Sequence, residues 1–110
     1  MDLSELDKLE QATKPLDEAG ELLMAAANLI EQRGLERHAF VGPDGALCVQ
    51  GALSVAAGLS AGSVHYRSGP WKANDRLGRL LGQAAYRWIC REEVSPAMVV
   101  AKMREAALLS

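Results

Sequence analysis

Apolar side chains recur at helical spacing along most of the chain, and residues 16–33 show the strongest pattern. Acidic side chains lie near the start of this segment, where they favour the positive end of a helix dipole, and Gly34 is typical of the position just past a helix end. A helix that is apolar over so much of its surface is buried on more than one side. The pattern therefore predicts a central helix, or a helix that also faces a partner. Its narrow polar stripe consists of Glu18, Glu21, Asn28 and Gln32.

Two more helices are predicted in the second half of the chain, at 75–91 and 96–108. Leucine and alanine recur on one side of the first, and Asn74 or Asp75 can cap its start. Ser95 followed by proline is a strong start signal for the second. Both helices are expected to pack against the central one.

Shorter helices are predicted at 3–12 and 51–58. The first has leucines at every third position on one side, and it is too short to be stable alone. Residues 1–14 are therefore expected to dock on the rest of the chain or to contact a partner.

A short β-hairpin is predicted at about 38–49. Strand candidates at 38–41 and 46–49 flank a Gly-Pro-Asp-Gly turn, in which Asp44 precedes Gly45, a residue that can take the positive φ that closes the turn. Two strands are barely stable alone, so the hairpin must lean on helices. The longest irregular stretch, 58–73, follows.

These elements predict a mainly α fold of four to five helices with one hairpin, in a single small domain over residues 1–110. No apolar run approaches the roughly 18 residues of a membrane span. The acidic N-terminus lacks the layout of a signal peptide. We therefore expect a cytoplasmic protein without membrane contact, whose two cysteines stay reduced.

The charge is unevenly distributed: residues 1–55 carry a net charge of −6 and residues 56–110 carry +4. This asymmetry fits either a nucleic-acid surface or two halves that neutralise each other, within one chain or across a dimer. The pI of about 5.6 is far below that of a typical nucleic-acid-binding domain, which favours neutralisation. The candidate contacts to nucleic acid or a partner are Arg67, Lys72, Arg76, Arg79, Arg87 and Arg91.

Cys48 and Cys90 are the obvious candidates for thiol chemistry. Position 51 holds glycine, so no C-x-x-C redox motif is present, and the cysteine and histidine spacings match no familiar zinc pattern. A reactive thiolate near a helix N-terminus stays open for Cys48. The favoured interpretation is a small buried residue between hairpin and helix, with Gly51 allowing the backbones to approach. On this view Cys48→Ser lowers the stability by about 1–3 kcal/mol.

Three segments, at 29–35, 43–53 and 88–107, together resemble a family of small uncharacterised proteins of actinobacteria and their phages. That family has a D-G-x-x-C-x-x-G-A-L element, then a tryptophan and a capped helix ending in two alanines. Leu35 stands where the family has tryptophan, and Ile89-Cys90 stand where it has Asn-Asp. The resemblance implies a fold and a genomic context rather than a mechanism. The matching motif residues are Asp44, Gly45, Cys48, Gly51, Trp88 and Ser95.

The first functional hypothesis is a non-enzymatic regulatory or protein-interaction module without cofactor or metal, acting as a homodimer and on an unidentified protein. The second is a nucleic-acid-binding protein that uses the arginine-lined helix at 75–91. The apolar surface of the helix at 16–33 and the leucine face of the helix at 3–12 support the homodimer. A monomer whose N-terminal helix folds back over the helix at 16–33 is the competing picture. Candidate dimer contacts are Leu3, Leu6, Leu9, Leu22 and Leu29.

Overall fold

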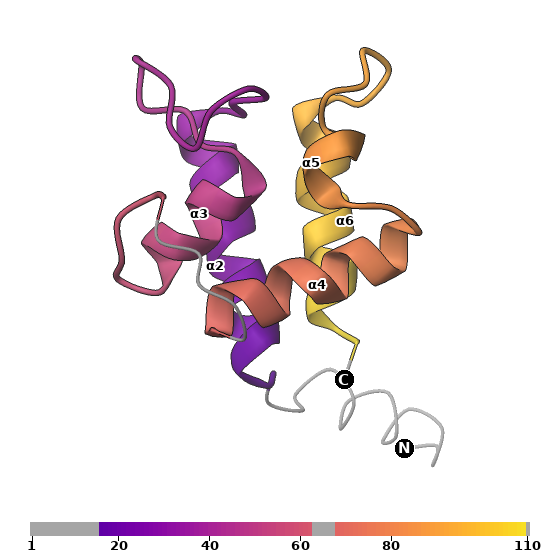
Figure 1. The fold of residues 1–110 in the computed structure, drawn as a ribbon. Coiled ribbons are helices and arrows are strands. Elements are labelled where there is room, and N and C mark those ends of the chain that lie inside the picture. Colours follow the sequence, from indigo (N-terminus) through magenta and orange to yellow (C-terminus); the bar gives the residue numbers. More distant parts are fainter. Residues whose placement is uncertain (1–15, 63–67, 110) are drawn as a thin grey trace, which may run out of the picture.

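The computed structural model describes residues 16–62 and 68–109. This part of the chain is mainly helical, as predicted, and forms five helices around one core (Figure 1). Helix α2 packs against α3, α4 and α6, which confirms that it is the central helix. Helix α4 lies across α2 and α6 rather than along them (Figure 1). The helices are α2 (Glu18–Arg33), α3 (Val49–Ala56), α4 (Gly69–Leu81), α5 (Ala85–Trp88) and α6 (Pro96–Ala107).

Side-chain and glycine caps fix the ends of α2 and the start of α6. The Asp17 carboxylate accepts a hydrogen bond from the Gly20 N–H at 2.8 Å, and Gly34 ends the helix with φ +96°. The Ser95 hydroxyl accepts a bond from the Met98 N–H at 3.2 Å. These two helices lie where the sequence predicts them, because local capping chemistry marks their ends.

The predicted single helix at 75–91 is wrong. Helix α4 starts six residues earlier, at Gly69, because the Ser68 hydroxyl caps it by accepting the Trp71 N–H at 3.2 Å. Asn74 and Asp75 lie inside the helix. Gly82 then takes a left-handed φ of +71° and ends α4, after which one further turn forms α5.

The predicted hairpin is reduced to a turn and two isolated bridges. Leu47 pairs with Leu35 in parallel and with Val41 in antiparallel fashion. The Gly42 N–H donates to the Ala46 carbonyl at 2.7 Å, and Gly45 takes a φ of +88°. The expected second strand ends early because Cys48 caps α3, so that Val49 is already helical.

Apolar side chains from all five helices form the core, which contains Leu23, Leu53, Leu77, Trp88 and Met103. Among the described residues no helix is long and apolar enough to cross a membrane. The predictions for 1–14, including Leu3, Leu6 and Leu9, and for Arg67 lie outside the described residues.

Candidate functional site

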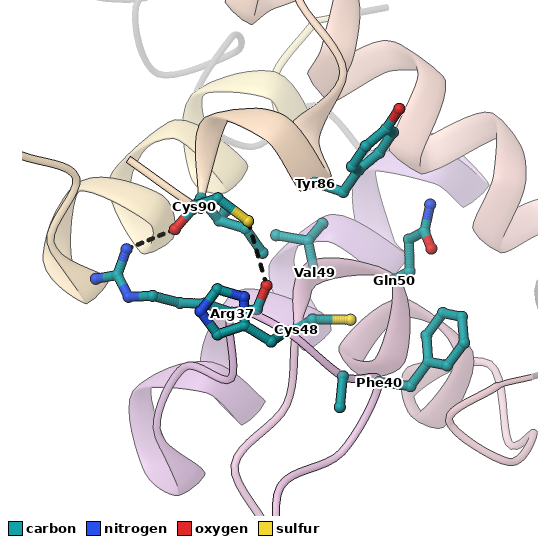
Figure 2. A pocket seen from close by; sticks show the side chains of 10 residues that line it. Arg37, Phe40, Cys48, Val49, Gln50, Tyr86 and Cys90 are labelled. Carbon is teal, nitrogen blue, oxygen red and sulfur yellow. Dashed lines mark hydrogen bonds between the residues drawn. The ribbon is translucent and has the colours of Figure 1, made fainter. Parts of the chain in front are cut away.

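A surface pocket of about 340 Å³ lies between the 37–40 segment, the start of α3, and α5 (Figure 2). Val49 and Ile89 contribute buried apolar surface, each with 1% exposure. Phe40 and Tyr86 are 44% and 54% exposed. We call it the aromatic pocket. Its lining residues are Arg37, His38, Ala39, Phe40, Cys48, Val49, Gln50, Tyr86, Ile89 and Cys90.

The side chain of Arg37 joins the two segments that form the pocket walls. Its guanidinium donates to the carbonyl oxygens of Ile89 at 2.5 Å, Arg91 at 3.2 Å and Val94 at 2.7 Å. In return, the Cys90 thiol donates to the Arg37 carbonyl at 3.4 Å. Figure 2 shows two of these bonds beside the pocket. Arg37 therefore holds the loop before α3 against the chain segment after α5.

Sequence reasoning missed Arg37. Its acceptors are backbone carbonyls 52 to 57 residues further along the chain. Every residue carries a backbone carbonyl, so no side-chain pattern marks these positions. The three carbonyls lie close together only in the folded chain, where the segment after α5 turns back on itself.

Cys48 occupies the N-cap position of α3. Its Sγ accepts a hydrogen bond from the Gly51 N–H at 3.2 Å. Only 9% of the residue is exposed, and burial raises the pKa of the thiol. At neutral pH Cys48 is therefore a protonated thiol with a capping role, unlike a reactive thiolate.

Gly51 lets α3 approach the preceding loop. A Cβ at this position would lie 2.1 Å from the Phe40 carbonyl oxygen. That oxygen also accepts the Cys48 N–H at 3.3 Å. This close approach brings the Phe40 backbone onto the start of α3 and thereby forms one side of the pocket.

The other motif residues, Asp44, Gly45, Trp88 and Ser95, stabilise a turn, the core or a helix end. The Asp44 carboxylate accepts the Ala46 N–H at 3.2 Å within the turn that Gly45 closes. Trp88 is 8% exposed and belongs to the core, and Ser95 caps α6. Cys48 thus lines the aromatic pocket, while Asp44, Gly45 and Ser95 shape turns and helix ends.

The predicted basic residues do not share one helix face, because Gly82 separates α4 from the turn that follows. Arg79 pairs with Asp75 at 2.7 Å, and Arg91 lies 4.0 Å from Glu93. The Arg87 guanidinium lies over the Tyr86 ring, 5.8 Å from its centroid. Acidic partners within the chain therefore offset part of this positive charge, at Arg79 and Arg91.

Arg76 forms a two-pronged ion pair with Asp17, which links α4 to the start of α2. One of its bonds measures 2.9 Å. Hydrogen bonding to the guanidinium lowers the pKa of Asp17 to about 2. Lys72 lies near this pair, in a second groove beside α4.

The candidate dimer residues Leu22 and Leu29 are half-buried and pack against the chain's own core. Part of their surface is therefore already covered. In the ranges 16–62 and 68–109, no group of three or more His, Cys, Asp or Glu side chains could hold a metal ion.

No curated protein and no solved structure is similar enough to match the chain. A family of unknown function, DUF6197, matches residues 14–108, which include the aromatic pocket and residues 54–87, the stretch between the last two motif segments. The match extends over most of the chain, and the protein therefore belongs to the DUF6197 family.

Proposed function

We propose that the protein is a non-enzymatic regulatory interaction module, and that its aromatic pocket receives an apolar side chain of a partner protein. The observation that carries this proposal is the exposure of Phe40 and Tyr86 at 44% and 54% around an open pocket. The chain has only one phenylalanine and two tyrosines, so two of its three Phe and Tyr rings lie at this site.

The composition of the pocket supports binding rather than catalysis. The exposed rings of Phe40 and Tyr86 offer apolar surface beside the buried side chains of Val49 and Ile89, while Gln50 and His38 add polar groups at the same pocket. Interfaces commonly centre on an apolar anchor in such a pocket, with aromatic residues around it. The raised pKa of the Cys48 thiol and its hydrogen bond from the Gly51 N–H support a structural role for this residue rather than a catalytic one.

The resemblance to actinobacterial and phage proteins supports a partner from the same setting. The homodimer and the nucleic-acid alternative stay predictions. The ion pairs of Arg76, Arg79 and Arg91 lessen the positive charge available for phosphate contacts.

Site-specific photocrosslinking in the native host tests the proposal. A photoreactive amino acid at Tyr86 is expected to give a discrete protein adduct that disappears in the Phe40→Asp variant. The same amino acid at Met98, which is 43% exposed on α6, serves as the matched control. Identical adducts from both positions, or an adduct that survives Phe40→Asp in a folded protein, would contradict the proposal.

A further inference from the structure

A second groove lies between the start of α2 and helix α4, and its volume is about 710 Å³. Its apolar lining comes from Ala19 on α2, Trp71 and Leu80 on α4, and Leu109 near the end of the chain. We call this the α2–α4 groove. Leu109 is 44% exposed and its neighbour Leu108 is 73% exposed. Apolar surface is therefore available on this side of the molecule.

The groove begins where the N-terminal segment joins the fold. Asp17 caps α2 and also lines the groove, so residues 1–15 are connected directly to its edge. A tether this short gives a segment an effective concentration in the millimolar range, on the order of that of short flexible linkers. As a helix, 14 residues would extend about 21 Å, at about 1.5 Å per residue.

The groove is lined by acidic and basic side chains in equal number, and Arg76 and Arg79 pair with Asp17 and Asp75. Lys72 and Arg79 line the groove, and the Arg79 side chain is 81% exposed although it pairs with Asp75. Within residues 16–62 and 68–109, Lys72 has no ion pair. The segment 1–14 carries four acidic residues and two lysines. Lys72 and the exposed Arg79 are therefore the groove cations that acidic side chains of the segment would contact.

We propose that residues 1–14 occupy the α2–α4 groove of their own chain. Leu3, Leu6 and Leu9 provide an apolar side that matches the lining of the groove, and the short tether favours the chain's own segment over that of a second copy. The α2–α4 groove and the aromatic pocket share no lining residue, so this proposal does not rest on the proposed function.

Paramagnetic relaxation measured by NMR on the full chain tests the placement. A spin label is attached at Ser4→Cys in a Cys90→Ser background, since Cys90 is the exposed native thiol. The indole signal of Trp71 is expected to broaden, whereas that of Trp88, buried on α5, serves as the internal reference. An unbroadened Trp71 signal would overturn the proposal.

Mixing distinguishes the chain's own segment from that of a second copy. Isotope-labelled protein without a spin label is combined with unlabelled, spin-labelled protein, and no broadening of Trp71 is expected. Broadening in this mixture would assign the groove to a neighbouring copy and would also overturn the proposal.

Substitutions on both sides of the contact provide the second test. Leu6→Asp, or Lys72→Glu combined with Arg79→Glu, is expected to abolish the broadening of Trp71 in the spin-labelled chain. Arg91→Glu changes an exposed arginine after α5 and is expected to leave it intact. Equal broadening in all three variants would show that neither the leucine face nor the groove charges hold the segment, contrary to the proposal.

Discussion

Position 51 has no room for a side chain. A Cβ there would lie 2.1 Å from the Phe40 carbonyl oxygen, which is backbone and cannot rotate away. Gly51→Ala is therefore expected to force α3 and the loop apart and to lower the free energy of unfolding by about 1–3 kcal/mol. Urea denaturation measures this loss.

Gly62→Ala is the matched control, because the contact that its Cβ would make in the described part of the chain is with the Phe40 ring, at an ordinary 3.7 Å. Its effect on the free energy of unfolding should stay within about 0.5 kcal/mol. Equal losses in the two variants would show that the contact with the Phe40 carbonyl is not responsible.

The capping role of Cys48 changes what is expected of its substitution. The sequence alone predicts a costly buried hydroxyl in Cys48→Ser, but the Gly51 N–H is in place to donate to it. Serine is a favoured N-cap residue, so Cys48→Ser should change the unfolding free energy by less than about 1 kcal/mol, whereas Cys48→Ala should lower it by about 1 kcal/mol. Thermal and urea unfolding of both variants provide the measurement, and a larger loss for serine than for alanine would refute the capping role.

At the scale of elements, Arg37 connects the loop before α3 to the segment after α5. Arg37→Met would leave the carbonyls of Ile89, Arg91 and Val94 without this donor. The free energy of unfolding is expected to fall by about 2 kcal/mol, since bonds to charged groups are stronger than neutral ones. Arg33→Met, at an exposed position in the last turn of α2, is the control in urea denaturation and should have little effect. Similar losses in both would show that the three carbonyls gain little from Arg37.

The ion pair between Asp17 and Arg76 makes the contact of α2 with α4 sensitive to acid. The pKa of Asp17 is lowered from 3.8 to about 2, so the pair stabilises the fold above pH 3.8 and loses this effect as the pH falls through about 2. The Asp17 side chain is 45% exposed, which limits the contribution to less than about 1 kcal/mol.

Asp17→Asn isolates the charge, because asparagine also caps helices. The variant should be slightly less stable than the native protein at neutral pH and equally stable near pH 2. Urea titrations across this range measure the difference. A difference that persists unchanged at low pH would point to the cap rather than to the ion pair.

How far the sequence predicts these elements depends on how local their signals are. Asp17, Gly34 and Ser95 mark their helix ends through neighbouring backbone groups, so α2 and α6 were predictable. Gly82 lies within the predicted helix at 75–91 because its flanking residues keep an apolar period, and only the left-handed conformation of the glycine ends the helix there. The aromatic pocket was not predictable, since Phe40 and Tyr86 line the same pocket only through the packing of α3 against α5.

At the scale of the whole molecule, the proposed placement of residues 1–14 predicts a monomer. Light scattering at micromolar concentration should give a mass near 11.8 kDa, because the apolar side of the segment is then covered within one chain. A mass of twice this value, lost on Leu6→Asp, would support the homodimer instead. Met98→Asp, at an exposed apolar residue of α6, is the control for a general effect on solubility.

The bonds from Arg37 to the 89–94 segment also have a consequence for synthesis on the ribosome. The ribosome synthesises the pocket wall at residues 37–50 first, and the opposite wall, at residues 86–90, follows about 50 residues later. A nascent chain that has exposed α2 and α3 therefore carries Phe40 without its opposing ring. Any partner that needs both rings can bind only after α5 has been synthesised, so the timing of recognition is set by the order of translation.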